Sequence, residues 1–214
     1  QPYNFNTPAN QELLTYLTDL FNNNCAWNSR LTSPYTYFAD RQALFYSGTL
    51  QDISIQTRVN EHVSSNDQWK VMPYPNTLNK PVLVTSGLSY AIVQSDTSAE
   101  NDSATNLAAW LLASWLNRPE NMVKLSNAGG MLPSSSTALQ NMQSYKTRYP
   151  QWKEASGWLS RTQTTPAIGS WQAARLVLSD AGWMVFNPKP TPDSPGTVLD
   201  MLDKTIYDVL LHRP

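Results

Sequence analysis

The sequence predicts a helix-rich α/β fold. Short apolar runs bounded by Gly, Pro or Ser predict strands, and longer segments whose apolar residues recur every three or four positions predict helices. Their alternation along the chain is typical of α/β proteins. The chain has 214 residues, so it can form one large domain or two small ones with a substantial core.

Capping residues and apolar spacing predict the helices. Thr7 precedes Pro8 as a helix start, and leucines then recur on one face as far as Phe21. The Gly129-Gly130 pair is a strong end signal for the helix before it. The predicted helices cover residues 7–22, 33–38, 99–117, 120–127, 135–145, 151–159, 170–179 and 197–211.

Four short apolar runs predict the strands. They cover residues 42–46, 70–72, 81–85 and 89–94, and each is bounded by Gly, Pro or Ser. The Trp residues at 110, 115, 152, 158 and 183 are interpreted as packing residues. The total of eight Trp and ten Tyr fits carbohydrate binding, in which a sugar ring stacks on an aromatic face, and fits a core or an interface equally.

Composition excludes several classes of function. Charged residues make up 14% of the chain and the net charge is -1, whereas a nucleic-acid-binding surface needs a cluster of Lys and Arg. No apolar run is long enough to span a bilayer, so we expect a soluble chain. The residues after Gln1 do not form a signal peptide, and any export signal is expected upstream.

The sequence predicts no cofactor, no metal site and no catalytic residue. His62 and His212 lie far apart without ligand spacing, and no phosphate-binding loop or nucleophile motif is present. Pairing of Asp40 with Asp52, or of Glu154 with Asp180, could supply two carboxylates, but nothing in the sequence favours either pair. The single Cys25 is either a packed or surface thiol or a link to another chain.

Five segments share the order of motifs of one family. They are the aromatic-to-glycine segment 38–48, the segment 69–75 with its two prolines, the small-residue turn 86–89, the segment 130–138 and Trp171 followed by Gln-Ala-Ala-Arg. In order and spacing they resemble the extracellular solute-binding proteins of ABC importers, specifically the carbohydrate-binding family that includes the maltose-binding protein. Arg41 departs from the family pattern, which commonly has Gly there, and Leu50 stands where a sugar-stacking Trp is found.

The resemblance implies a two-lobed fold of the type II periplasmic-binding-protein kind. Residues 1–79 and 133–214 would belong to its C-terminal lobe, and residues 80–132 to its N-terminal lobe. The chain would then be a fragment, the C-terminal half of a receptor whose N-terminal half lies upstream. Such a receptor is extracellular, periplasmic or at the cell surface, and delivers a sugar to the permease subunits of the transporter.

The resemblance also implies a set of ligand-binding residues. They are Ser47, Gly48, Thr49, Asp52, Ser86, Gly87, Leu88, Ser89 and Trp171. Ordinary roles stay open: the glycines suit any turn, the hydroxyls can bond local backbone, Asp52 can cap a helix that starts at Ile53, and Trp171 can pack between helices.

We therefore expect a sugar-binding receptor component and not an enzyme. The alternatives are a carbohydrate-active enzyme or its accessory domain, and a structural surface protein of the same fold. The apolar helix face with Leu107, Leu111 and Trp115 would in the intact receptor pack on the N-terminal lobe. In this chain we expect that face to be buried by self-association with a second copy or by folding onto the C-terminal lobe.

Overall fold

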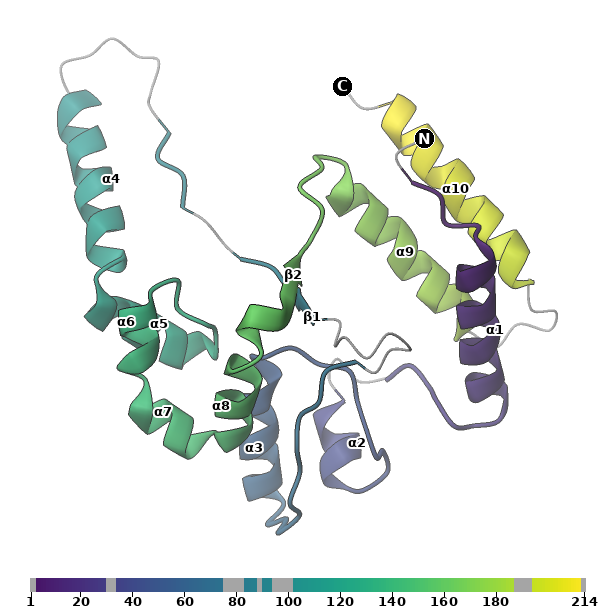
Figure 1. The fold of residues 1–214 in the computed structure, drawn as a ribbon, viewed down its shortest axis with the longest axis horizontal. Helices are drawn as coiled ribbons and strands as arrows, with labels where there is room; N and C mark the ends of the chain where they lie inside the picture. The colour runs from purple at the N-terminus through teal and green to yellow at the C-terminus, as the bar shows by residue number, and fades with distance from the viewer. Residues whose placement is uncertain are drawn as a thin grey trace. The chain divides into compact units, whose positions relative to one another are not determined.

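The computed structural model describes residues 3–29, 34–74, 83–87, 90–93, 102–186 and 194–212. These residues are mostly helical and contain two strands of three residues each, which confirms a helix-rich chain (Figure 1). They form two compact units. Unit 1 comprises Gln1–Thr32 and Thr165–Pro214, and unit 2 comprises Ser33–Thr164.

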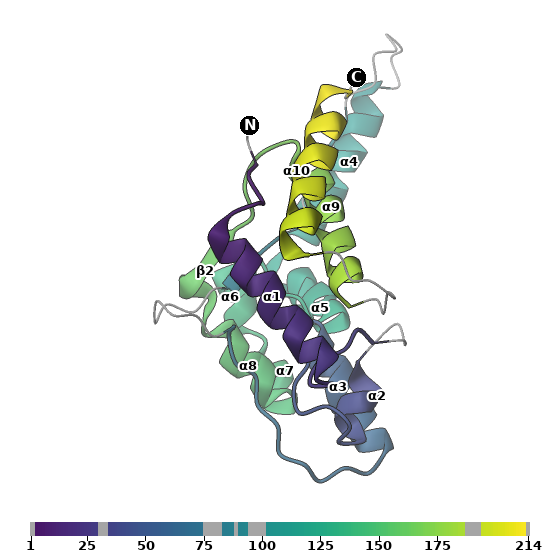
Figure 2. The same ribbon diagram turned by 90° about the vertical axis from the view of Figure 1, so that its right-hand side faces the viewer.

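Unit 1 is a group of three helices that pack side by side (Figure 2). They are α1 (Pro8–Asn22), α9 (Trp171–Val185) and α10 (Pro195–Leu211). The Oγ of Ser194 accepts from the backbone N–H of Thr197 at 3.2 Å and so caps α10. The core of this unit is formed by Phe5, Ala174, Val177, Val198, Leu199, Leu202 and Ile206.

The segment before α1 is fixed to α10 through one carboxylate. Asp203 accepts the backbone N–H groups of Phe5 at 2.7 Å and of Asn6 at 3.0 Å. Partly buried backbone N–H groups need a hydrogen-bond acceptor, and in this segment, which is neither strand nor helix, the carboxylate of Asp203 is that acceptor. The two parts of unit 1, which are far apart in sequence, are joined here.

Unit 2 contains the remaining elements. Its helices are α2 (Tyr35–Ala39), α3 (Asp52–His62), α4 (Asp102–Leu116), α5 (Pro119–Gly129), α6 (Ser136–Gln140), α7 (Gln143–Arg148), α8 (Pro150–Ser156) and the 3-10 turn η1 (Leu159–Arg161). Ile53, Met142, Tyr145 and Trp152 form its buried core. The indole N–H of Trp152 donates to the carbonyl of Gly130 at 2.8 Å, so this buried Trp has its polar atom satisfied.

Gly130 ends α5 in the left-handed region, with φ of 66°. This is the conformation that the Gly-Gly end signal predicts. A Cβ at this position would lie 3.1 Å from the Cα of Gln51. Glycine here therefore permits both the helix end and the close approach of the residue before α3.

The single small sheet within the described residues pairs β1 (Leu83–Thr85) with β2 (Thr162–Thr164) in parallel. The predicted strand 81–85 is confirmed for its described part. The predicted strands 42–46 and 70–72 are wrong, and so is 90–93, the described part of 89–94. Residues 42–43 instead bond back to the carbonyl of Tyr37 to close a turn, and Val71 packs on the core of unit 2 without a neighbouring strand.

Most predicted helices are confirmed, with two differences. The predicted helix 135–145 is divided into α6 and α7, and α3 was anticipated only in the alternative that Asp52 caps a helix starting at Ile53. The buried face of α3 includes Gln56 and Asn60, whose side chains bond each other at 2.8 Å. Because these buried positions are polar, the sequence of α3 lacks apolar residues at every third or fourth position, which is the pattern used to predict a helix.

The Trp residues assigned to packing differ in burial. Trp152 is fully buried, but Trp110, Trp115 and Trp183 are exposed, so the assignment is wrong for these three. None of the described helices has the length and hydropathy that a membrane span requires. The lobe boundaries implied by the resemblance concern an intact receptor and remain a prediction.

Candidate functional site

Four of the candidate residues lie in and after the turn that joins α2 to α3. Ser47, Gly48 and Thr49 are exposed, and Asp52 is the first residue of α3. One oxygen of Asp52 accepts from the backbone N–H of Thr49 at 2.5 Å and from its hydroxyl at 2.9 Å. The other oxygen accepts from the hydroxyl of Tyr35 in α2 at 2.5 Å. The carboxylate therefore fixes the turn to α2.

The glycine in this turn is required by close packing. A Cβ on Gly48 would lie 3.0 Å from the Tyr46 ring and 3.1 Å from a carboxylate oxygen of Asp52. The idea that Asp52 caps a helix beginning at Ile53 is wrong, because α3 already includes Asp52 and its N-cap is Gln51. Asp52 instead organises the turn that precedes the helix.

Aromatic rings surround the turn. Tyr46 makes edge contacts with Tyr35 and Phe38, at centroid distances of 6.0 and 5.4 Å. Burial, then the hydrogen bond from its hydroxyl to Asp52 and the negative charge of that carboxylate, raise the pKa of Tyr35 to about 12. Burial and the same charge also raise the pKa of Tyr46. Both phenols therefore stay neutral hydrogen-bond donors over the physiological range.

Two further aromatic residues near the turn are exposed and were not predicted as site residues. Phe45 is 80% exposed and Tyr74 is 59% exposed. The hydroxyl of Tyr74 shares a hydrogen bond with the hydroxyl of Ser47. Phe45 belongs to the apolar run 42–46, which predicts a buried strand, so nothing in the sequence suggested an exposed ring there. The turn thus combines exposed residues, exposed aromatic rings and two hydroxyl groups that each take part in one hydrogen bond within the protein.

The two departures from the family pattern have structural explanations. Arg41 has φ of 60°, in the left-handed region that glycine adopts most easily. Its guanidinium forms two hydrogen bonds of 2.8 Å with Asp67 and lowers the pKa of that carboxyl. Leu50 packs on the core of unit 2 and does not replace a stacking Trp at the surface.

The remaining candidate residues are elsewhere. Ser86 and Gly87 follow β1 and are exposed, whereas Leu88 and Ser89 lie outside the described residues. Trp171 is the first residue of α9 in unit 1. Its ring is half-buried against the core of that unit, and its indole N–H is buried without a hydrogen-bond partner in the described structure. Packing therefore holds this ring, and its contact with a ligand remains a prediction.

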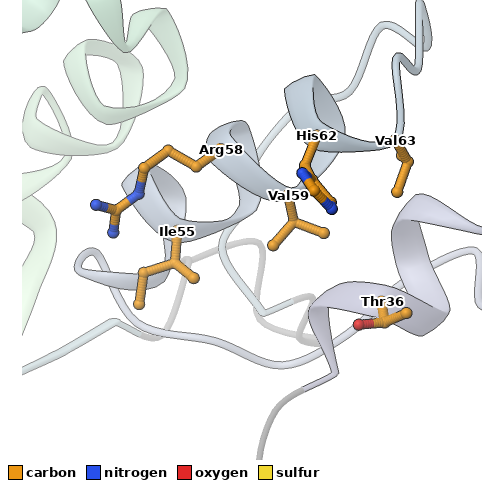
Figure 3. Close-up of a pocket in the computed structure, with 6 residues that line it drawn as sticks. All are labelled: Thr36, Ile55, Arg58, Val59, His62 and Val63. Atoms are coloured by element: carbon orange, nitrogen blue, oxygen red, sulfur yellow. The ribbon is translucent and has the colours of Figure 1, made fainter.

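A concave region lies between α2 and α3. This open groove of about 340 Å³ is mostly apolar, and Figure 3 shows Ile55 and Val59 of α3 on the side that faces Thr36 of α2. Arg58 and His62 are its charged or titratable residues. The groove includes none of the predicted site residues, and it presents no carboxylate or thiol for catalysis.

The described residues contain no cluster of three or more His, Cys, Asp or Glu that could hold a metal ion. Asp40 is exposed at the end of α2, and both oxygens of Asp52 accept hydrogen bonds. The turn is therefore suited to hydrogen bonding and ring stacking with a ligand. Compared with models of protein families and with curated proteins, the chain matches none.

Proposed function

We propose that this chain is the C-terminal part of the solute-binding component of an ABC importer. The component captures a sugar or an oligosaccharide between two lobes outside the cytoplasm, closes about a hinge and passes the ligand to the permease. The proposal starts from the resemblance of five ordered motifs. The left-handed backbone at Arg41, where that family commonly has glycine, supports it.

The chemistry of the α2–α3 turn is the observation that carries the proposal. A sugar presents hydroxyl groups around its edge and apolar C–H groups on its faces. The hydroxyl of Thr49 donates to Asp52 and that of Ser47 shares a bond with Tyr74, so both oxygens still have a lone pair that can accept from a sugar hydroxyl. Exposed rings such as Phe45 offer a surface for stacking. Asp52 holds this arrangement in place before a ligand arrives, which reduces the entropy that binding must overcome.

The enzyme alternative needs two carboxyl groups on either side of a glycosidic bond, about 5 to 10 Å apart. Asp52 is the acidic residue of the turn, and its hydrogen bonds to Tyr35 and Thr49 give it a structural task. The turn therefore favours binding over hydrolysis.

Calorimetric titration with a panel of mono- and oligosaccharides tests the proposal. The full-length protein should bind at least one sugar, and the 214-residue chain alone should bind weakly or not at all because part of the cleft is outside it. If the full-length protein binds none of the sugars, the proposed function is refuted. Tight binding by the chain alone would refute the two-lobe mechanism, and release of shorter sugars during titration would favour the enzyme.

Variants of the full-length protein locate the site. Trp171→Ala and Phe45→Ala should each weaken binding by about 1 to 3 kcal/mol, the usual scale for loss of an aromatic platform. Trp183→Ala is the matched control, because Trp183 is an exposed Trp on the same helix as Trp171. Equal losses for Trp171→Ala and Trp183→Ala would contradict a specific role for Trp171.

A further inference from the structure

The turn between α2 and α3 carries one formal charge, and that charge is negative. Residues 42–52 contain no Lys, Arg, His or Glu, and their one acidic side chain is Asp52. The ion pairs of the described residues join other side chains, and neither of them includes Asp52. The carboxylate therefore has no cationic partner in the part of the chain that the structure describes.

Asp52 acts on a ligand at this turn mainly through its charge. A carboxylate offers about four acceptor sites, and Asp52 uses three of them, for the hydroxyl of Tyr35 and for the backbone N–H and the hydroxyl of Thr49. Its charge reaches its neighbours, because it adds to the effect of burial in raising the pKa of Tyr35 and of Tyr46. Thr49 is exposed, so the carboxylate lies one hydrogen bond away from the surface on which a sugar would lie.

The outer side of the turn offers acceptors and not donors. The hydroxyl of Thr49 gives its only proton to Asp52, so its oxygen is left to accept. Donation to a charged carboxylate also polarises this hydroxyl and makes its oxygen a better acceptor. The exposed rings of Phe45 and Tyr74 have faces of partial negative charge, which attract cations. A ligand group that donates hydrogen bonds or carries positive charge is therefore complementary to the turn, and an anionic group is not.

The positive features near the turn do not outweigh this charge. Helix α3 begins at Asp52, and the positive end of a helix dipole equals about half an elementary charge, so it offsets only part of the carboxylate. Arg41 donates two hydrogen bonds to Asp67, and the pair has no net charge. Lys70 is exposed in the segment that precedes Tyr74, and the variant Lys70→Gln separates its effect.

We propose that the α2–α3 turn selects its sugar by charge and that Asp52 determines this selection. The turn binds an amino sugar, with its protonated amine, more tightly than the neutral sugar, and it binds the uronic acid least. The inference rests on the proposed function, because it names the substrate class of the same site. Through water at about 7 Å, one unit charge changes an affinity about three-fold, and the charges of amine and uronate shift it in opposite directions.

Calorimetric titration of the full-length protein with glucose, glucosamine and glucuronate, and with the same three forms of galactose, tests the inference. At about pH 6.5 an ordinary amine is protonated and an ordinary carboxyl is ionised. The amine should bind most tightly and the uronate least. A rise in ionic strength from about 0.01 M to about 1 M shortens the screening length from about 30 to about 3 Å, so both affinities should approach that of the neutral sugar.

Variants of the turn assign the effect to Asp52. Asp52→Asn should lower the ratio of the uronate dissociation constant to the amine dissociation constant by roughly five-fold or more. Gln51→Lys adds a cation while the bonds of Asp52 stay in place, because the side chain of Gln51 is exposed and does not cap α3; it should lower the ratio in the same way. Glu154→Gln removes the same charge from an exposed position on α8 and is the matched control, which should keep the ratio within about two-fold of the parent.

The outcomes separate this inference from the proposed function. Equal ratios in the parent and in Asp52→Asn, or a parent that binds the uronate most tightly, would overturn the inference and leave sugar binding intact. Loss of such a uronate preference in Lys70→Gln would show that Lys70 sets the selection. Because the parent and the variants share the same upstream lobe, a change in the ratio belongs to the turn. A protein that binds no sugar, neutral ones included, refutes the proposed function and this inference with it.

Discussion

Replacement of Asp52 by Ala should destabilise unit 2 by about 2 kcal/mol. The bond from Tyr35 is half-buried, and loss of a charged acceptor there costs about 1 to 1.5 kcal/mol. The two bonds from Thr49 are exposed, so water replaces the carboxylate and each loss is a few tenths of a kcal/mol. Asp52 also lies in the first turn of α3, where an acidic side chain contributes about 0.3 to 1 kcal/mol.

Urea unfolding followed by tryptophan fluorescence measures this free energy, and Asp67→Ala is the control. Asp67 also accepts bonds from a side chain, but its ion pair with Arg41 is exposed and screened by water. Its replacement should therefore have a clearly smaller effect than Asp52→Ala. If the two variants unfold at the same urea concentration, the argument that Asp52 organises the turn is refuted.

Two further predictions concern pH and backbone geometry. The pKa of Tyr35 is raised from 10.0 to about 12, so its contribution to stability should be complete below pH 10 and should be lost as the pH rises through about 12. In Asp52→Asn, tyrosinate absorbance should show that Tyr35 ionises at a lower pH than in the parent protein. An unchanged titration would contradict the role of Asp52 in raising this pKa. Gly130→Ala should lower the free energy of unfolding by about 2 kcal/mol or more, because the left-handed backbone is strained for Ala and the backbone of Gln51 lies close. Gly182→Ala, in open space on α9, should instead raise the free energy of unfolding by about 0.5 to 1 kcal/mol. If Gly130→Ala leaves the free energy of unfolding unchanged, the end of α5 can relax to accept the new side chain.

The elements that sequence predicts best are those with strong local signals. Helix α10 has a Ser cap, a Pro in its first turn and buried residues at Val198, Leu202 and Ile206, all of which can be seen in the sequence. Strand β2 is different, because its sequence Thr-Gln-Thr has no apolar period and it is a strand only through its pairing with β1. Contacts between distant residues decide such elements, and local patterns do not encode them.

The candidate site shows the same division. Ser47, Gly48, Thr49 and Asp52 are close in sequence, so a single motif predicts them together. The partners that complete the turn come from other segments: Tyr35 lies in the preceding helix and Tyr74 in a later loop. Their roles depend on tertiary contacts that only coordinates provide. Trp171 was predicted from its motif, and its half-buried packing in unit 1 corresponds to the alternative role that the sequence left open.

The chain connectivity of unit 1 constrains the order of folding during synthesis. Its first part ends at Thr32 and its second part begins at Thr165, so all of unit 2 lies between them in sequence. On a ribosome, α1 emerges long before the carboxylate of Asp203 that holds the segment preceding it. Unit 2 is continuous and can fold as it emerges. Closing a loop of more than a hundred flexible residues would cost roughly 4 kcal/mol of entropy, and prior folding of unit 2 shortens that loop before α9 and α10 arrive.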